Sequence, residues 1–414
     1  MTPSLNGMND LFHSGIAGDE FEPTPAAAQA RLAAVRPHAY ARTRNALEGD
    51  VTRLSPYITH GFLTLPQVLA AVLQRGPLPV EHKLVYELAW REYFQHVWHH
   101  LGEGIFESLH EGVLPEAAYA TALPADIRQG ATGVPVIDQA VRTLYATGYL
   151  HNHARMWLAS YVVHLRKVHW RAGADWLYGH LLDGDLASNH LSWQWVAGTG
   201  SHKPYLFNAE NVERYAPKAW HSRGTVVDSS YGALDRLARQ SRAVPGGRGE
   251  PVAEPPLCSA PPEGVAFVPV EKAGQAGHAG QAMRAWEGRE LQLWHPWALA
   301  SAEMPGAVPV AVLDETFHRR WPWSPARWRF VGARLQTVAG TAVMGTPQAL
   351  GAALGSARRV HGLHNPHLAP AMKALDLQPG VRLLNWPEKR CASFSQFWHR
   401  SVRGLNDAAE LVPF

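Results

Sequence analysis

Cysteine is scarce in this sequence: its 414 residues include only Cys258 and Cys391, far apart in the chain. An iron–sulfur cluster held by cysteine alone takes four thiolates, so that class of cluster is excluded. Two distant cysteines also make a disulfide framework unexpected. The sequence has no long apolar run, which predicts no membrane span, and its start, "MTPSLNGMNDLF", lacks the charged-then-apolar pattern of a signal peptide. We expect a reduced, cytoplasmic protein without a metal site.

An excess of charge of one sign is also missing, because 38 Lys and Arg face 35 Asp and Glu. The net charge of +3 therefore does not by itself indicate nucleic-acid binding. Hydrophobic residues make up 46% and charged residues 18%, which is typical of a globular chain. The length is sufficient for two or more domains. What the sequence has in abundance is tryptophan, with 16 residues.

Residues 25 to about 220 show the apolar spacing of helices. The segments 78–100 and 134–148 carry apolar stripes at this spacing, and Gly148 marks a helix end. The segments "HNHARMWLASYVVHL" and "GADWLYGHLL" continue the pattern without an alternating strand signal. We therefore expect a helical domain over residues 1–235.

The composition changes after this region. Residues 236–285 are rich in proline, glycine and alanine, which predicts a linker or a long surface loop. Beyond them, short strand candidates alternate with helices such as "SPARWRFVGARLQTV", where Ser324 is the expected N-cap and Pro325 lies in the first turn. This alternation predicts a small α/β domain with a parallel sheet over residues 286–414, so the fold class is mainly α with an α/β addition. The strand candidates are "ELQLWH", "VPVAVLD", "TAVMG", "RRVHGLH" and "VRLLNW".

The stretch "DGDLASNHLSWQWVAGTG", residues 183–200, concentrates polar and indole side chains. On a helix, Asn189 and Trp193 lie one turn apart on the same face, and Trp195 points to the other side. Asp185 lies one turn before Asn189, and Asp183 lies in the turn that leads into the helix, where carboxylates suit a helix N-terminus. Two capping acids and two core indoles are the alternative interpretation.

A second polar stretch, "TRLSPYITHG", begins at Thr52. Thr52, Arg53 and Ser55 form a short turn before a helix that carries Pro56 near its start. The amides and hydroxyls of such a helix start suit a phosphate. An ordinary Ser-Pro helix start is the alternative.

Together with "ELAWREYF" and "TGVPVIDQAVRTLYATGYLHNHARM", these two stretches occur in the order seen in one known domain. Over residues 25–215 the sequence resembles the FAD-binding domain of the photolyase/cryptochrome family. The resemblance implies an all-helical domain that holds a folded FAD. The residues that it implies at the cofactor are Tyr40, Thr52, Arg53, Leu54, Ser55, Arg91, Asn152, Arg155, Asp183, Asp185 and Asn189.

Within this set, the resemblance gives three residues particular roles. Arg155 is expected to pair with Asp183 beside the isoalloxazine, because a buried acid needs a cation. Asn189 matches the residue that faces flavin N5, where a neutral amide can donate or accept a hydrogen bond. An acid at that position would favour the neutral flavin radical, so asparagine favours repair chemistry.

The resemblance also assigns an electron-transfer role to tryptophans. Trp193 and Trp170 match the first two members of the chain that carries electrons to the photoexcited flavin. The third member has no obvious counterpart, and the candidates are Tyr119 and Trp176. Simple packing is the alternative for Trp170 and Trp176.

The other face of the 183–200 helix is expected to receive a flipped-out cyclobutane pyrimidine dimer. Indoles can grip the dimer, as flat aromatics do for other flipped bases, and Glu87 can hydrogen-bond a pyrimidine ring. A surface pair of Glu87 with Arg91 is the alternative. Asn152 stands where the (6-4) repair enzymes of the family have a histidine, and His153 is expected at the pocket rim. The residues implied at the catalytic pocket are Glu87, Trp90, Asn152, Met156 and Trp195.

The C-terminal region resembles a shortened form of the family's antenna domain, through "LQLWHPWALASAEMPGAVPVAVLDE" and "PWSPARWRFVGARL". This domain normally comes first, so the resemblance implies a swapped domain order, as in a circular permutation. The arginines typical of the start of the antenna domain are absent, and the sequence does not identify an antenna pigment.

These observations favour a deoxyribodipyrimidine photolyase, a light-driven carbon–carbon lyase that acts on DNA containing pyrimidine dimers. The alternative is a cryptochrome-like flavoprotein that senses blue light or redox state without repair, through a protein partner that the sequence does not identify. A third possibility is a structural protein that has lost FAD. A basic surface at the pocket mouth would support DNA binding. The candidates for that surface, with a solvated face as the alternative, are Arg166, Lys167, Arg171, His202 and Lys203.

Overall fold

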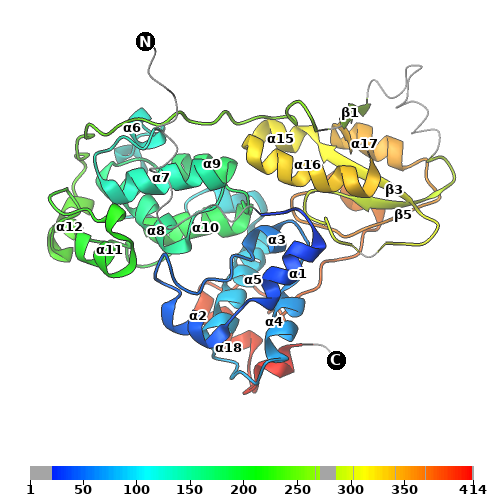
Figure 1. The fold of residues 1–414 in the computed structure, drawn as a ribbon, viewed down its shortest axis with the longest axis horizontal. Helices are drawn as coiled ribbons and strands as arrows, with labels where there is room; N and C mark the ends of the chain where they lie inside the picture. Colours follow the sequence, from blue (N-terminus) through cyan, green and yellow to red (C-terminus); the bar gives the residue numbers. More distant parts are fainter. Residues whose placement is uncertain are drawn as a thin grey trace, which may run out of the picture.

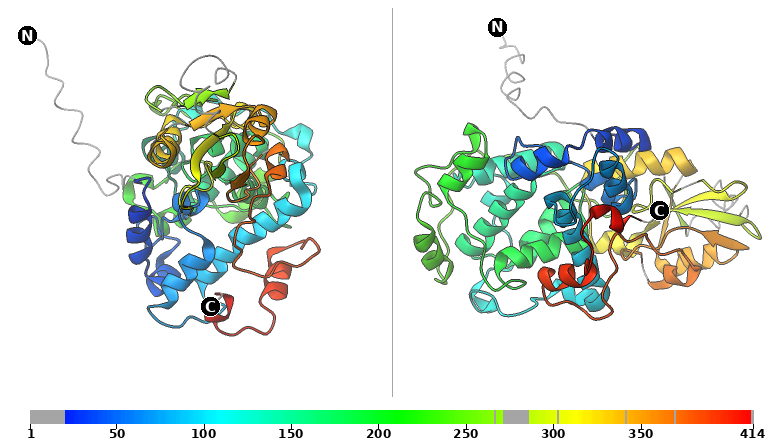
Figure 2. Two further views of the ribbon diagram at one scale, coloured as in Figure 1. Left: turned by 90° about the vertical axis from the view of Figure 1, so that its right-hand side faces the viewer. Right: turned by 90° about the horizontal axis from the view of Figure 1, so that it is seen from below.

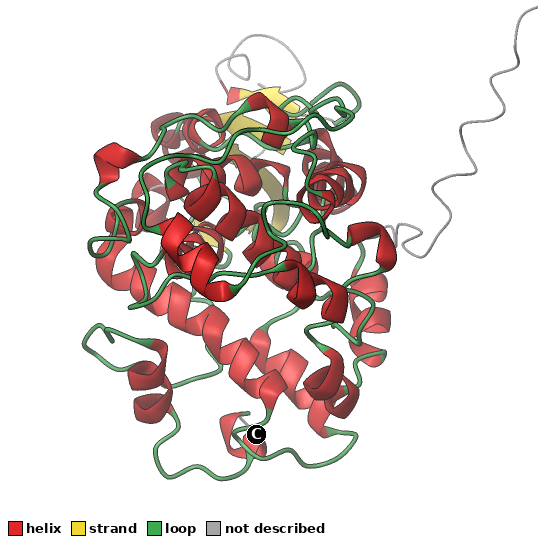
Figure 3. Ribbon diagram, turned by 90° about the vertical axis from the view of Figure 1, so that its left-hand side faces the viewer, coloured by secondary structure: helices red, strands yellow, loops and turns green. Residues whose placement is uncertain are grey.

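The computed structural model describes residues 21–265, 267–270, 286–301, 303–340, 342–368 and 370–412. The first 20 residues of the expected helical domain and residues 271–285 of the expected linker lie outside the described residues. Helices make up most of the regular secondary structure, and the strands gather at one end (Figure 1, Figure 3). Among the described residues, no helix is both long enough and apolar enough to span a lipid bilayer.

Residues 25–238 form the helical region that the apolar spacing predicts. Helix α7 ends where expected, because Gly148 adopts a φ of 65°, in the left-handed region that favours glycine. Helix α10 begins after Asp185, whose carboxylate accepts the Ser188 N–H at 2.8 Å. The helices are α1 Pro25–Ala33, α2 Pro37–Thr43, α3 Ser55–Thr59, α4 Leu65–Leu73, α5 Lys83–Leu101, α6 Ala125–Arg128, α7 Pro135–Thr147, α8 Asn152–Ser160, α9 Trp170–His180, α10 Leu186–Ala197, α11 Ala209–Tyr215 and α12 Tyr231–Ala238.

The segment after α12 runs along the helical region toward the sheet (Figure 1). Its backbone is held there by hydrogen bonds: the Val244 N–H donates to the Leu165 carbonyl and the Gly249 N–H donates to the Ala131 carbonyl, at 2.8 and 2.9 Å. This proline-rich segment is therefore fixed to the helices over part of its length.

The C-terminal region contains a five-stranded sheet in the order β1-β4-β3-β2-β5, and all neighbouring strands are parallel. The predicted parallel sheet is confirmed, but β1 was not predicted, because its three residues lie in a proline-rich segment. Helices α15 Glu315–Arg320, α16 Pro325–Ala339 and α17 Pro347–Leu354 pack against the strands. Ser324 caps α16 as expected. The strands are β1 Phe267–Pro269, β2 Glu290–Trp294, β3 Val308–Asp314, β4 Ala342–Gly345 and β5 Arg359–His361.

The prediction of a strand at "VRLLNW" is wrong. The Leu383 and Leu384 N–H groups donate to the carboxylate of Glu92 on α5, at 2.5 and 3.0 Å, and Trp386 Nε1 donates to the same carboxylate at 2.9 Å. The backbone groups of this apolar segment are thus satisfied by a buried acid instead of a neighbouring strand.

This segment begins a stretch that returns to the helical region, residues 382–403, which we call the C-terminal strap. It includes α18, Phe394–Ser401, which packs against α5. The Cys391 N–H donates to His96 Nε2 at 3.1 Å, which adds a second attachment to α5. Figure 2 shows the strap beside this long helix, far from the sheet.

The helical and α/β regions also share a buried contact behind the turn Asp183–Asp185. His60 Nδ1 of the helical region lies 2.5 Å from the Pro296 carbonyl oxygen, and its Nε2 lies 2.9 Å from the Leu182 carbonyl oxygen. Arg327 of α16 is fully buried, and its Nη2 donates to the Gly184 carbonyl at 2.6 Å. One continuous hydrophobic core includes residues of both regions.

Candidate functional site

A cavity of about 600 Å³ opens among α2, the loop before α3, and helices α5, α8 and α10. This volume is within the roughly 300–1,000 Å³ of small-molecule and cofactor sites. The cavity brings together nearly all of the residues that the sequence singled out. Those that line it are Tyr40, Thr52, Arg53, Ser55, Glu87, Trp90, Arg91, Asn152, Arg155, Met156, Asp183, Asp185, Asn189, Trp193 and Trp195.

Two of the predicted residues, Leu54 and Trp170, do not line this cavity. Leu54 is buried where the chain enters α3. Trp170 is buried at the start of α9, and its indole N–H donates to Ser108 Oγ at 3.0 Å. Both side chains lie outside the lining.

The predicted pair of Arg155 with Asp183 is present. Arg155 Nη2 lies 2.9 and 2.8 Å from the two carboxylate oxygens, and Arg155 Nε donates to the Leu150 carbonyl at 2.7 Å. Burial raises the pKa of Asp183, but the Arg155 charge and hydrogen bonds from Arg155 and Ser55 outweigh it and hold this pKa below its usual value. The cavity therefore keeps a charged carboxylate at its inner wall.

Asp185 is a second buried acid that stays charged. Gln95 Nε2 donates to its two carboxylate oxygens at 3.1 and 2.9 Å, and Arg91 Nη2 lies 3.9 Å from one of them. Burial raises the pKa of Asp185, whereas Arg91, His367 and Ser188 lower it, and the net pKa is below the usual value. Gln95 was not predicted, although it lies one turn after Arg91 on α5.

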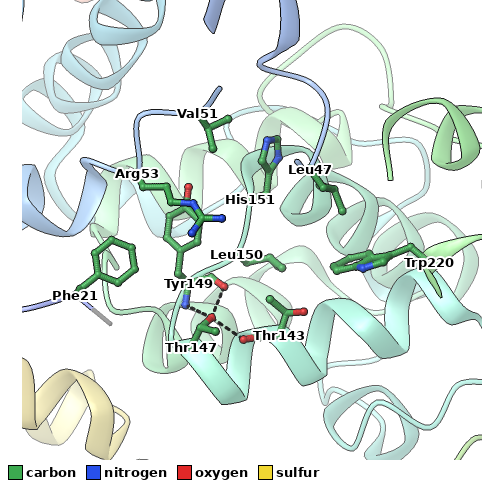
Figure 4. A pocket seen from close by; sticks show the side chains of 10 residues that line it. All are labelled: Phe21, Leu47, Val51, Arg53, Thr143, Thr147, Tyr149, Leu150, His151 and Trp220. Atoms are coloured by element: carbon green, nitrogen blue, oxygen red, sulfur yellow. Dashed lines mark hydrogen bonds between the residues drawn. The ribbon is translucent and has the colours of Figure 1, made fainter. Parts of the chain in front are cut away.

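The loop 51–54 forms another wall. Arg53 has a φ of 49°, and a non-glycine residue in this region costs about 1–3 kcal/mol, so the surrounding structure must hold it. The Arg53 guanidinium lies 5.8 Å from the ring centroid of Tyr149. Both residues, with Val51 and His151, also line a smaller pocket behind the loop (Figure 4).

Helix α10 separates its side chains as the spacing predicts. Asn189 Nδ2 donates to the Ala174 carbonyl of α9 at 2.8 Å, so its carbonyl oxygen remains for another donor. The ring of Trp193 packs on Gly173 of α9, where an added Cβ would lie 2.3 Å from an indole carbon. Trp193 is buried, whereas Trp195 is 36% exposed. The buried face thus points to α9 and the exposed indole lies nearer the solvent.

Glu87 does not form the surface pair with Arg91 that was the alternative interpretation. Its carboxylate lies 2.7 Å from Arg44 Nη1, at the end of α2. Burial raises the pKa of Glu87, and the nearby Arg44 charge opposes this shift. Arg44 lines the cavity too, and sequence reasoning missed it.

Trp90 has a partner that the sequence interpretation also missed. The ring of Phe394 in the strap stacks on it with centroids 4.0 Å apart and planes 7° apart. The apolar spacing of Phe394, Phe397 and Trp398 is typical of an amphipathic helix, but this spacing does not identify the partner of its apolar face. Phe394 fixes one side of the indole, which still lines the cavity.

The electron-transfer candidates lie on adjacent helices. Trp193 lines the cavity from α10, and Trp170 lies on α9. Beyond Trp170, the ring of His169 lies 5.6 Å away and the ring of Tyr119 lies 6.3 Å from His169. Trp176 instead contacts Tyr145 and His180. Tyr119 therefore remains the better placed candidate for a third member.

Some of the expected basic residues are not at the surface. The predictions for Arg166 and Lys167 are wrong, because both are buried. Arg166 pairs with Asp126 at 2.7 Å, and Lys167 Nζ donates to the last carbonyls of α12 at 2.8 and 2.7 Å. Arg171 is half-buried and pairs with Asp175 at 2.6 Å, while His202 and Lys203 are exposed.

The cavity also offers polar atoms that lack a protein partner. In the described part of the chain, Ser188 Oγ and His151 Nε2 are buried without a hydrogen bond, and both residues line the cavity. A ligand with hydroxyl, amide and phosphate groups would satisfy such atoms. With Arg53 and Arg155 as cations and Asn189 as an amide, the lining fits a dinucleotide with a polar ring system.

Comparisons with known proteins agree with this geometry. Residues 84–227 match the sequence profile described as the FAD binding domain of DNA photolyase. Over this segment the chain is similar to proteins of the photolyase/cryptochrome family. FAD is thus the cofactor of its helical domain, and the residues just described fit it.

The relatives of this chain are named either cryptochrome or photolyase. The chain is 33% identical over 221 residues to cryptochrome DASH of Idiomarina loihiensis. This alignment covers 49% of this chain and 48% of that protein. It is 35% identical over 171 residues to a deoxyribodipyrimidine photo-lyase of Streptomyces griseus, covering 37% of this chain and 34% of that protein. A solved Synechocystis sp. PCC6803 cryptochrome is 28% identical, with a TM-score of 0.42 over 49% of this chain and 46% of that chain. The chain spans about half or less of the length of these relatives.

Proposed function

We propose that this protein is a light-driven photolyase that splits cyclobutane pyrimidine dimers in DNA. The observation that carries the proposal is that one cavity is lined by two sets of side chains. The set expected at FAD lies around Arg53, Asp183 and Asn189, and the set expected at the dimer includes Glu87 and Trp195. A cofactor and a flipped-out pyrimidine dimer would therefore share one cavity.

Reduced FAD, when bound, supplies the electron on excitation by light; the two carbon–carbon bonds of the cyclobutane ring break, and the electron returns, so nothing is consumed. The chain's own residues hold the substrate. Trp90, fixed by Phe394, and the exposed Trp195 offer flat apolar surfaces to the dimer. Glu87, oriented by Arg44, offers a carboxyl group to a pyrimidine ring.

The test is a repair assay on the full chain. FAD content is measured by absorption, the cofactor is reduced chemically, and a single-stranded oligonucleotide with one thymine dimer is added under blue light. Chemical reduction bypasses the tryptophan chain, so the assay tests the cavity alone. We expect light-dependent loss of the dimer. Bound, reducible FAD without dimer loss would contradict the proposal.

A second candidate function is light or redox sensing without repair. The relative named cryptochrome DASH favours it, as does the position of Tyr119, a tyrosine instead of a tryptophan, beyond His169 and Trp170. The repair assay separates the two functions, because a sensor keeps reducible FAD and leaves the dimer intact.

A further inference from the structure

The C-terminal strap, residues 382–403, is strongly cationic. It holds five Lys and Arg against one acid, Glu388, whereas the whole chain has 38 Lys and Arg against 35 Asp and Glu. All five cations are exposed, and within the described residues none of them forms an ion pair with a carboxylate. Outside the strap, the counts of basic and acidic residues are nearly equal, so the chain has no excess of positive charge there. The five cations are Arg382, Lys389, Arg390, Arg400 and Arg403.

The strap is fixed beside the cavity. Phe394 stacks on Trp90, whose indole lines the cavity. Glu92 accepts three hydrogen bonds from the strap, and His96 accepts a fourth. Two helix residues thus anchor the strap's backbone, so its cations are carried on a positioned support next to the Trp90 wall.

A cation also lies near Trp195, the other indole expected at the dimer. Ser201 Oγ donates to the Trp195 carbonyl at 2.9 Å, which fixes the following loop to the end of α10. In this loop Lys203 is exposed. A positive side chain of the loop therefore lies near Trp195, as the strap cations lie near Trp90.

We propose that the C-terminal strap binds the backbone phosphates of the damaged DNA strand on the Trp90 side of the dimer. Exposed, unpaired Lys and Arg provide the charge that phosphate contacts need, and such contacts position a strand without reading its bases. A DNA strand is favoured over an acidic protein because the strap adjoins a cavity with aromatic walls of the kind that grip flipped bases. This inference rests on the proposed function.

The experiment compares two triple variants of the full chain with FAD bound. Lys389→Gln/Arg390→Gln/Arg403→Gln removes three strap cations, and Arg242→Gln/Arg329→Gln/Arg359→Gln removes three exposed cations elsewhere. Affinity for a single-stranded oligonucleotide with one thymine dimer is measured from 50 to 200 mM salt. Each phosphate contact contributes about 0.7 to the slope of log affinity against log salt on single strands. We expect the slope of the strap variant to fall by about 2, with the control variant and the wild type alike.

The outcomes separate this inference from the proposed function. If the wild type repairs the dimer and the strap variant keeps the wild-type slope, the strap inference is overturned alone. Equal loss of slope in both triple variants overturns it too, because the effect is then one of net charge. The wild type could instead bind damaged DNA, with the expected lower slope in the strap variant, but fail to repair the dimer. In that case the strap inference is supported and the proposed repair function is wrong. A wild type with bound FAD and no affinity for the oligonucleotide overturns both. FAD content and circular dichroism of each variant confirm folding.

Discussion

The helical region and the α/β region both bury charged and polar side chains, but they use them differently. In the helical region several of these groups, among them Asp183 and Asp185, line a cavity. In the α/β region, Arg327 and His367 face the back of the turn Asp183–Asp185: Arg327 donates to the Gly184 carbonyl, and His367 Nε2 lies 3.4 Å from the Leu186 N–H. The α/β region therefore supports the turn Asp183–Asp185 from behind.

Loss of the Arg155–Asp183 ion pair in the cavity should have the largest effect on stability and FAD binding. In Asp183→Asn, Arg155 loses its carboxylate partner in a largely buried position. Breaking a buried pair costs about 3 kcal/mol, so we expect a lower free energy of unfolding and near-complete loss of FAD. Urea unfolding and the flavin absorption of the purified protein measure both.

The matched control is Asp235→Asn, which breaks an exposed pair with Arg239 on α12. We expect full FAD content and little change in stability. A similar loss of FAD in both variants would contradict the role of the Asp183 pair.

Loss of the Arg327 contact behind the turn Asp183–Asp185 should have a smaller effect than loss of the Asp183 carboxylate. It should weaken FAD binding without lowering stability. Arg327 is buried, and its Nε and Nη1 have no hydrogen-bond partner among the described residues. Replacing a buried ion by a well-packed apolar side chain is often neutral for stability. For Arg327→Met we therefore expect an unchanged or higher Tm, and FAD binding weakened about tenfold, or about 1.4 kcal/mol.

The measurement is titration of the apoprotein with FAD, alongside a thermal melt. Rescue of the affinity by Arg327→Lys would indicate that the charge at the Gly184 carbonyl matters. Loss of Tm with an unchanged FAD affinity would make Arg327 a packing residue only.

The histidines at the contact between the two regions predict acid sensitivity. Burial lowers the pKa of both His60 and His367 to about 3, against about 6.5 in the unfolded chain. Between these values the unfolded state binds protons that the folded state does not, so stability falls as the pH falls from about 6.5 toward 3. Each histidine contributes a slope of about 1.4 kcal/mol per pH unit.

In His367→Gln we expect the dependence of unfolding free energy on pH to be shallower by about this amount near pH 5. Urea unfolding at pH 7, 6 and 5 measures it, with the exposed His202→Gln as control. Equal slopes in wild type and His367→Gln would refute the buried neutral state of His367.

The substrate side of the cavity should give the most limited effect. Glu87→Gln keeps the size and the hydrogen-bonding capacity of the side chain but weakens its attraction to Arg44. We expect normal FAD content and a repair rate lowered several-fold. Glu213→Gln, in an exposed pair with Arg223, is the control with unchanged repair.

The sequence predicted much of the cavity because its contacts are local or lie in recognisable stretches. The opposite faces of Trp193 and Trp195 follow from helical spacing, and the Arg155–Asp183 pair followed from the resemblance. Capping by Asp185 was the alternative interpretation of that residue. The order of strands and the position of the strap could not be read in this way. They depend on long-range contacts such as Glu92 with Leu383 and Phe394 with Trp90, which no local pattern specifies.

The same reason explains the wrong predictions. "VRLLNW" has the apolar composition of a strand, and only the buried Glu92 reveals where its N–H groups are satisfied. Arg166 and Lys167 look like surface charges in sequence, but Asp126 and the carbonyls at the end of α12 hold them inside. Burial of a charge depends on a partner that is distant in the chain.

The most direct test of the account asks whether the cofactor and the dimer occupy two sides of one cavity. Trp195→Ala removes the exposed indole, and Trp90→Ala/Trp195→Ala removes both, at about 1–3 kcal/mol of stacking per base. FAD content and affinity for the dimer-containing oligonucleotide are measured on the same preparations. The expected result is full FAD content in both variants, with the dimer affinity lowered in the single variant and lost in the double variant. Loss of FAD in Trp195→Ala, or unchanged dimer affinity in the double variant, would contradict it.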